Sequence, residues 1–240
     1  MASLPRIFVP GPISPGALSI DGEAAKRLTS VLRLRAGDAL TIFCGDGREY
    51  EATFEGAAGK RVAVTVGPVV RQEPPAPLTL ELHCGLVRAN RFDTVIEKAT
   101  EAGADVIVPL ISEHSVRGEK PSASRFERWE RIAIEAAEQS GRLYVPVLGQ
   151  PASFEAAVRA AGSVAFVCEP GGMPWPGASR LLPERGRLVL LVGPEGGFSR
   201  QEVEVARAAG AVVAAIAPHT LRTETAAILA TGLVRAAALH

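Results

Sequence analysis

One local pattern constrains the fold of this chain more than any other: an apolar run that stops at a glycine-rich turn and then opens into a helix. The run is Leu188–Val192, which is typical of a buried strand. The turn Gly193–Gly197 follows, and Ser199 with Glu202 has the spacing of a helix capping box. Such a turn exposes backbone N–H groups that can hold a small polar ligand. The pattern is also compatible with a tight connection in any α/β domain.

A second strand-to-helix junction follows later in the sequence. Residues Ala211–Ala217 form another apolar strand candidate, and after a short loop Leu221–Ala227 opens a helix. The carboxyl ends of parallel strands meet at one edge of a sheet, so we expect both loops at a common site. Arg222 and Glu224 supply charge beside a helix that is otherwise apolar. Thr223 is equally compatible with a simple capping role, with Glu224 favoured by the positive end of the helix.

Several common chemistries lack their sequence signatures. The chain contains neither G-x-x-x-x-G-K-[ST] nor G-x-G-x-x-G for nucleotide phosphates, and no G-x-S-x-G nucleophile elbow. Glu195 in the glycine turn would repel a phosphate, so a cationic or zwitterionic ligand is expected there. The 3 cysteines and 4 histidines show no metal-ligand spacing, and we predict no metal.

The overall charge gives no indication of a nucleic-acid partner. Lys and Arg total 26, and Asp and Glu also total 26, so the net charge is zero. A surface for RNA must therefore be a local patch rather than a global field. The apolar runs are shorter than the ~18 residues that a membrane helix needs. Because no basic-then-apolar leader opens the sequence, we expect a cytoplasmic protein.

A proline-rich stretch, Arg71–Pro77, predicts a domain boundary because proline interrupts helices and central strands. We therefore expect one domain at residues 1–73 and a second at residues 74–240. The first combines short strands, an amphipathic helix near Gly22–Leu32 and a hairpin turn at Asp46-Gly47, which indicates a small β-barrel with a helical plug. Its strand candidates are Arg6–Pro10, Ala39–Cys44, Arg48–Phe54 and Val62–Val66.

Beyond the prolines, strands and helices alternate, which is typical of an α/β domain with a largely parallel sheet covered on both faces. The predicted strands are Leu78–Gly85, Val106–Leu110, Val164–Val167, Leu188–Val192 and Ala211–Ala217. The predicted helices are Phe92–Gly103, Arg125–Ser140 and Glu224–Leu239. The last helix is apolar nearly all round, so either a partner subunit or other helices of the chain must cover it.

Two segments carry a specific resemblance to a known family. LVGPEGGFSRQEVE at residues 191–204 and LRTETAA at residues 221–227 resemble the ribosomal RNA small-subunit methyltransferase E family of the SPOUT superfamily. Lys98–Ala104 and Glu135–Arg142 match further family segments, so the likeness covers nearly the whole chain. The resemblance implies a PUA-like, RNA-binding barrel followed by a SPOUT-type, largely parallel sheet with a C-terminal trefoil knot.

The chain departs from the family pattern at three places. The family usually has L-G-P-R before LRTET, where this chain has Ile216–Thr220, which leaves the role of His219 open. Ala102 replaces a usual leucine, a loss of core volume. Arg88–Arg91 stands where the family often carries a lysine-glycine turn, so the positive charge is kept while the shape changes.

The resemblance implies S-adenosyl-L-methionine as cofactor, N3 of a uridine in 16S ribosomal RNA as methyl acceptor, and a homodimer. N3 carries a proton in the neutral base, and that proton must leave before N3 can accept a methyl group. An arginine near O2 or O4 would stabilise the negative charge that develops, and a carboxylate would take the proton. Arg222 is the candidate for the first role, and Glu195 or Glu224 for the second. Arg222 is also compatible with a phosphate contact or an ion pair with Glu224. A SPOUT methyltransferase for another RNA such as tRNA, and a non-catalytic ribosome assembly factor, remain alternatives.

The same resemblance assigns the cofactor-binding residues, whereas the arginines for RNA are chosen by their position in the sequence. The cofactor cleft is implied for residues on three loops: Cys168, Glu169, Val192, Gly193, Pro194, Gly196, Gly197, Ile216, Ala217, Leu221, Thr223 and Ala226. RNA contact is predicted for Arg6, Arg33, Arg35, Arg88 and Arg91. Because N3 is buried in a base pair, we expect the target uridine in a structured single-stranded region.

Overall fold

The computed structural model describes residues 4–115, 121–161 and 164–238. The chain forms two compact units: residues 1–75 with 137–145, and residues 76–136 with 146–240. The second segment of the first unit lies inside the domain that the sequence placed at 74–240, so the predicted division differs from the observed one at residues 137–145. No helix of the described part is long and apolar enough to cross a membrane.

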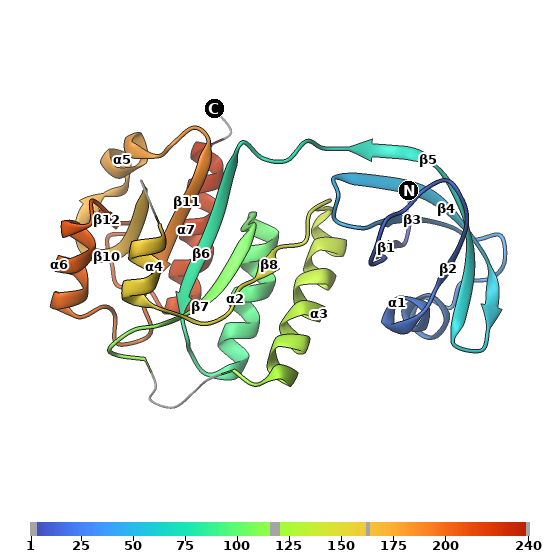
Figure 1. Ribbon diagram of the computed structural model, residues 1–240, viewed down its shortest axis with the longest axis horizontal. Helices are drawn as coiled ribbons and strands as arrows, with labels where there is room; N and C mark the ends of the chain where they lie inside the picture. Colours follow the sequence, from blue (N-terminus) through green and yellow to red (C-terminus); the bar gives the residue numbers. More distant parts are fainter. Residues whose placement is uncertain (1–3, 116–120, 162–163, 239–240) are drawn as a thin grey trace. The chain divides into compact units, whose positions relative to one another are not determined.

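The first unit is built on a five-stranded sheet with the order β1-β3-β4-β5-β2 (Figure 1). Its strands are β1 (Arg6–Phe8), β2 (Gly16–Ile20), β3 (Ala39–Phe43), β4 (Arg48–Ala58) and β5 (Arg61–Gln72). The turn between β3 and β4 is the predicted one: Gly47 has φ 84°, and Asp46 Oδ1 accepts a hydrogen bond from Arg48 N at 3.0 Å. Sequence reasoning missed β2, which pairs antiparallel with β5.

Alternating side chains of these strands make the core of the unit. Leu40 and Ile42 of β3 are fully buried, as are Val62, Val64 and Val66 of β5 to within a few per cent. This alternation is what a sheet with one covered face requires. The predicted helix is α1 (Gly22–Lys26) followed by a π-helical turn, η1 (Arg27–Val31). The chain leaves that turn through Arg33, which has φ 54°, a left-handed conformation that is uncommon for residues other than glycine.

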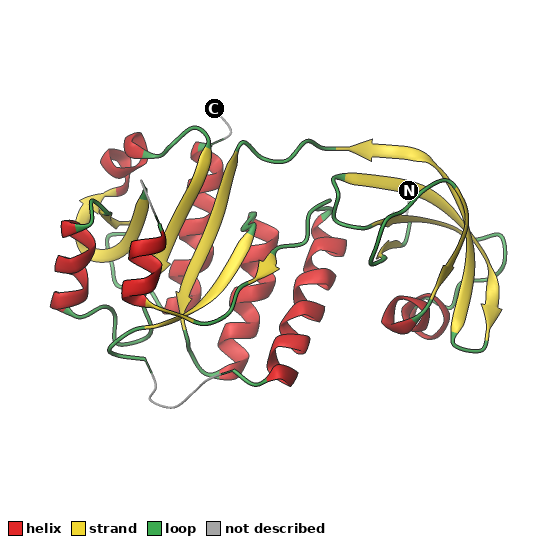
Figure 2. Cartoon of the chain, in the orientation of Figure 1, coloured by secondary structure: helices red, strands yellow, loops and turns green. Residues whose placement is uncertain are grey.

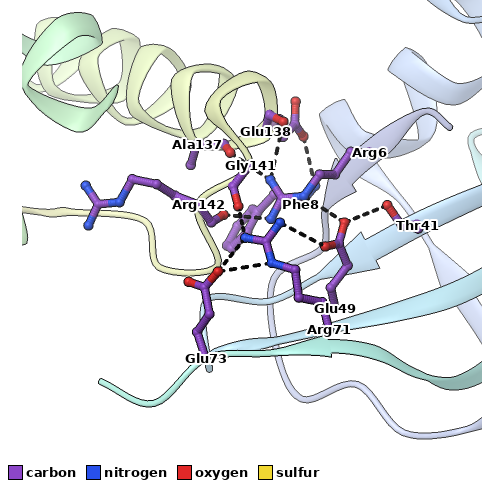
Figure 3. Close-up of polar contacts among 10 residues, drawn as sticks. All are labelled: Arg6, Phe8, Thr41, Glu49, Arg71, Glu73, Ala137, Glu138, Gly141 and Arg142. Carbon is purple, nitrogen blue, oxygen red and sulfur yellow. Dashed lines mark hydrogen bonds and ion pairs between the residues drawn. The ribbon is translucent and has the colours of Figure 1, made fainter. Parts of the chain in front are cut away.

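A polar network around Arg6 attaches segment 137–145 to the rest of the first unit (Figure 3). Arg6 Nε donates to Glu49 Oε1 at 2.8 Å, Nη1 donates to the Ala137 carbonyl at 2.7 Å, and Nη2 donates to the Arg142 carbonyl at 2.7 Å. The guanidinium also lies 3.8 Å from the centre of the Phe43 ring, and burial lowers the pKa of Arg6. These contacts engage the Arg6 guanidinium within the first unit, and the RNA contact predicted for Arg6 stays a prediction.

The second unit contains a parallel sheet with the order β12-β10-β11-β6-β7-β8, with β9 paired to β7 (Figure 2). All the recorded strand pairs in it are parallel, as predicted. The strands are β6 (Leu78–Gly85), β7 (Val106–Ile111), β8 (Val147–Leu148), β9 (Ala152–Ser153), β10 (Ala165–Pro174), β11 (Gly186–Val192) and β12 (Val212–Ala215).

Helices cover both faces of this sheet, which explains the continuous apolar run of β11. Val189 and Leu191 belong to a core cluster with residues of α4 and α6, and the alternate residues of the strand face the opposite side. There α7 packs against α2, β6 and β11. The helices are α2 (Ala89–Ala102), α3 (Ala123–Ser140), α4 (Phe154–Ala160), α5 (Trp175–Ala178), α6 (Arg200–Ala208) and α7 (Thr223–Ala237), with a 3-10 turn η2 (Ser179–Leu181).

The long predicted helices are confirmed, with small changes at their ends. α2 ends at Ala102, with Gly103 as its C-cap residue at φ 107°, and α7 starts one residue before the predicted Glu224. The predicted end of α7 at Leu239 lies outside the described residues. The short elements α4, α5, β8 and β9 were not predicted, because segments of two to seven residues carry little periodic signal.

Candidate cofactor site

The first wall of the site is the glycine-rich turn after β11. The Gly197 N–H donates to the Pro194 carbonyl at 2.9 Å, and Gly197 has φ 68°, which a residue with a side chain rarely adopts. The predicted capping box of α6 is present: the Ser199 hydroxyl accepts from Glu202 N at 3.2 Å, and Glu202 Oε2 accepts from Ser199 N at 2.9 Å. This reciprocal pair fixes the end of the turn.

Two neighbours that sequence reasoning missed hold the other side of the turn. Gly85, the last residue of β6, packs so closely that a Cβ there would lie 2.7 Å from the Gly193 carbonyl carbon. His114, which follows β7, has Nδ1 3.0 Å from the Gly196 carbonyl oxygen. A Cβ on Gly196 would meet the His114 side chain at 2.9 Å. The sequence did contain a signal for this role of Gly85. A glycine at the end of a predicted strand, directly before two apolar residues, can mark a close approach of another backbone segment.

The other two walls come from β10 and from the loop between β12 and α7. The pairing of β10 with β12 is interrupted between Cys168 and Met173, and the intervening residues loop out. Gly172 allows this, because a Cβ there would lie 2.6 Å from the Val213 carbonyl oxygen. α7 then begins at Thr223, with Arg222 as its extended N-cap residue.

The looped-out residues of β10 and the loops that follow β11 and β12 enclose a cavity of about 280 Å³. All of the residues that the sequence assigned to the cofactor cleft lie on its lining, and so does Glu195. The lining also includes four residues outside that assignment: Pro170, Phe198, His219 and Thr220. His219, whose role the altered family motif left open, is thus placed at the cavity.

The lining is mostly apolar and backbone, with few ionisable groups. Burial raises the pKa of the Cys168 thiol to about 12. Burial also raises the pKa of Glu169, and the positive charge of Arg207 opposes that change. At the end of β6, burial raises the pKa of Cys84, with smaller contributions from Cys168 and Glu224. Both thiols are therefore neutral near pH 7, so neither serves as a base or nucleophile in that form.

The three predicted catalytic residues have different settings: Glu195 lies on the cavity lining, whereas Arg222 and Glu224 flank the lining residue Thr223. Arg222 is exposed at the N-cap of α7. Glu195, on the cavity lining, forms an ion pair with Arg91. Glu224, in the first turn of α7, has Oε1 4.0 Å from Arg91 Nε. Arg91 therefore meets both carboxylates, whereas the predicted alternative was an ion pair between Arg222 and Glu224.

The arginines predicted to contact RNA also differ in their settings. Arg33 and Arg35 are exposed in the first unit, and Arg88 is exposed at the N-cap of α2 in the second. Arg91 is engaged with the two carboxylates, and Arg6 is held inside the network of the first unit. Among the described residues, no group of three or more His, Cys, Asp or Glu side chains could hold a metal ion.

Comparison with known proteins defines the class. Residues 74–235 match the RNA methyltransferase domain family, and residues 20–67 match the RNA methyltransferase PUA domain family. Ribosomal RNA small subunit methyltransferase E of Synechocystis is 31% identical, over 96% of this chain and 76% of the relative. The protein of the same name from Bacillus subtilis is 29% identical, over 88% of this chain and 87% of the relative.

Solved structures agree with these matches. A putative methyltransferase from Legionella pneumophila, in complex with bound SAM, superposes with a TM-score of 0.88 at 33% identity, covering 98% of each chain. Ribosomal RNA small subunit methyltransferase E from Neisseria gonorrhoeae, bound to S-adenosyl methionine, superposes with a TM-score of 0.82 at 27% identity, covering 97% of each chain. The chain belongs to the RNA methyltransferase family, and within it to the ribosomal RNA small subunit methyltransferase E proteins, which have the SPOUT fold.

Proposed function

We propose that this chain is an S-adenosyl-L-methionine-dependent methyltransferase that methylates N3 of a uridine in 16S ribosomal RNA. The observation that carries the proposal is that the three loops whose motifs resemble the methyltransferase family line one common cavity. The relatives named above supply further support, because their names give small-subunit ribosomal RNA as the substrate and S-adenosyl methionine as a ligand.

The cavity suits such a cofactor in size and chemistry. Its volume of about 280 Å³ is near the lower end of small-molecule sites, about 300 to 1,000 Å³. Ile216 and Leu221 supply apolar surface for an adenine ring, and the Gly193–Gly197 turn supplies a closely approachable backbone. The carboxylates of Glu169 and Glu195 suit a cationic ligand better than a phosphate. S-adenosyl-L-methionine supplies an electrophilic methyl group on a sulfonium.

The protein's own part in the reaction is to orient the uridine and make N3 electron-rich. We assign Arg222 to the oxygen of the uridine that gains negative charge, because it is exposed beside the cavity and is free to meet a base. Glu224 and Glu195 are the candidates for receiving the N3 proton, since Glu195 lines the cavity and Glu224 directly follows the lining residue Thr223.

RNA recognition is assigned to exposed arginines on both units. Arg33 and Arg35 in the PUA-like unit and Arg88 in the methyltransferase unit present guanidinium groups to solvent. Such groups bind phosphates and stack on unpaired bases. Arg6 is left out of this surface because its nitrogens already contact other groups of the first unit.

Three further features complete the proposal: a C-terminal trefoil knot, a cytoplasmic location and a homodimer. The homodimer has a physical argument of its own. α7 buries Ala227, Ala230 and Val234 against its own unit, while Leu229 on another face is 37% exposed. A second subunit would cover this residue. Light scattering at micromolar protein should give the mass of two chains, and the mass of one chain would contradict the dimer.

The test of the function is to methylate defined RNA with the purified protein. Small ribosomal subunits lacking the modification are incubated with cofactor, and the digested RNA is analysed for nucleosides by mass spectrometry. We expect N3-methyluridine in the small-subunit RNA. A modified nucleoside in transfer RNA alone would indicate the related activity on another RNA. Cofactor binding and RNA binding without any product would favour a non-catalytic assembly factor. Either result would contradict the proposed function.

A further inference from the structure

Arg91 joins two loops that come from distant parts of the sequence. Its Nη1 pairs with Glu195 Oε1, on the turn after β11, and its Nε lies 4.0 Å from Glu224 Oε1, at the start of α7. Both loops line the cofactor cavity. The Arg91 side chain is 38% exposed and that of Glu224 is 15% exposed, so the contact lies at the boundary between solvent and interior.

The position of Arg91 in its own helix is electrostatically unfavourable. α2 starts after its N-cap residue Arg88 and has no acidic residue in its first turn, so Arg91 sits at the positive end of the helix dipole. Glu195 and Glu224, which come from other elements, compensate for this charge. Glu224 is itself well placed, because it lies in the first turn of α7 and its negative charge faces the positive end of that helix.

The two oxygens of Glu224 have different surroundings. Oε1 is the atom near Arg91, whereas Oε2 is buried and has no hydrogen-bond partner within the described part of the chain. A buried carboxylate oxygen without a donor is costly. Holding the carboxylate in this place therefore calls for a fixed cation beside Oε1, and Arg91 is that cation.

We infer that Arg91 is a positioning residue that holds Glu224 as the acceptor of the N3 proton and ties the Glu195 turn to the start of α7. This inference rests on the proposed function. In the transfer, the N3–H bond breaks and its proton goes to Glu224. N3 forms a bond to the methyl carbon, and the carbon–sulfur bond breaks with its electron pair left on sulfur. Arg91 keeps the ion pairs throughout and acts through Glu224 rather than by contacting RNA.

The first test separates positioning from RNA contact. In Arg91→Met we expect kcat to fall roughly tenfold, part of the about 10² to 10⁴ that a general base supplies. RNA affinity and its salt dependence should not change. Arg91→Lys should recover most of kcat, because an ammonium still pairs with both carboxylates. A weaker RNA affinity with a salt slope reduced by about one and an unchanged kcat would mean a phosphate contact, and would overturn the inference.

The second test asks whether Arg91 acts through Glu224. Glu224→Gln and the double variant Arg91→Met/Glu224→Gln should have nearly the same kcat, since Arg91 affects kcat only through Glu224. Losses that multiply would overturn the inference. Arg159→Ala is the matched control, because it removes an arginine from an exposed pair with Glu155 in α4; it should match wild type.

A third measurement needs no activity, so it separates this inference from the proposed function. Wild type, the two single variants Arg91→Met and Glu224→Gln, and their double variant are unfolded in urea without cofactor or RNA. We expect the destabilisation by the double variant to be smaller than the sum of the single effects, which would support the contact even if no N3-methyluridine forms. If the losses in the free energy of unfolding of the two single variants simply add in the double variant, the contact between Arg91 and Glu224 is contradicted, whatever the activity assay shows.

Discussion

The cofactor cavity of the second unit and the Arg6 network of the first unit are both built from residues distant in sequence, yet only the cavity was predictable. Its walls are loops that follow strand ends, and in a parallel sheet all such loops meet at one edge. The Arg6 network gathers residues of β1, β4 and segment 137–145. No periodic pattern relates those segments. The comparison suggests that cavity residues serve activity and network residues serve stability.

The largest expected effect on stability comes from a substitution in the Arg6 network. In Arg6→Ala, Glu49 is left with a side chain only 9% exposed, although Thr41 still donates to it at 2.7 Å. We expect a loss of about 3 kcal/mol in the free energy of unfolding, the lower end for breaking a buried pair. Urea unfolding followed by fluorescence measures it.

Arg6 also offers a matched control for its role. Arg6→Lys keeps the charge but loses the fork that donates to four acceptors at once, so an intermediate loss of stability is expected. The cofactor affinity of folded Arg6→Ala should equal that of wild type. If Arg6→Ala keeps full stability and instead weakens RNA binding, the original prediction of an RNA contact would be right and the network would not be structural.

On the cavity side, Arg222→Ala should lower kcat by roughly two orders of magnitude, the scale of losing one charge-stabilising donor. Its cofactor affinity and its urea midpoint should stay at wild-type values, because the Arg222 side chain is exposed. Single-turnover methylation and calorimetry together measure both quantities. Lost cofactor binding with an unchanged single-turnover rate would place Arg222 in the cofactor wall instead.

A smaller effect is expected from changing the glycines of the turn, and two of them form a matched pair. In Gly85→Ala the new Cβ would meet the Gly193–Pro194 backbone, which must shift, so cofactor affinity should fall by about tenfold, or about 1.4 kcal/mol. In Gly196→Ala the new Cβ would lie 2.9 Å from His114 Cβ, a less severe overlap than the one at Gly85, and His114 is an exposed residue after β7. Calorimetry should show the smaller loss for Gly196→Ala, and the reverse order would contradict this account of the turn.

These two glycines also show the limit of reading the site from sequence. The strand, turn and capping box around residues 188–202 were predicted because each is a local pattern with its own physical cause. Gly196 was expected to face the cofactor and lies on the cavity lining, but the side chain that a Cβ there would meet, His114, was not predicted. Gly85 was not singled out, because its close approach to the turn depends on β6 and β11 lying side by side. Side-chain partners across elements are set by packing, which the sequence pattern does not specify.

Ionic contacts show the same limit. Arg6 and Arg91 were both assigned to RNA from their position in the sequence, and both have acidic partners more than forty residues away. By contrast Arg33, Arg35 and Arg88 remain exposed, as an RNA surface requires. Charge type is readable from sequence, but the partner that neutralises a charge is not.

The smallest effect is expected at the exposed edge of the network. Arg71 pairs with Glu73 at 2.7 Å and lies 3.7 Å from Glu49, and its side chain is 41% exposed. Because water screens such a pair, Arg71→Ala should lower the free energy of unfolding by at most about 1 kcal/mol. A urea midpoint as low as that of Arg6→Ala would show that the whole network, rather than its buried part, holds segment 137–145.

The central claim is that the three-loop cavity of the second unit binds the methyl donor. Calorimetric titration of S-adenosyl-L-methionine into the purified wild-type protein tests it most directly. We predict saturable binding at one site per chain, weakened in Gly85→Ala and unchanged in Arg6→Ala under conditions where both variants are folded. No saturable heat at millimolar cofactor, or equal weakening by both variants, would contradict the account.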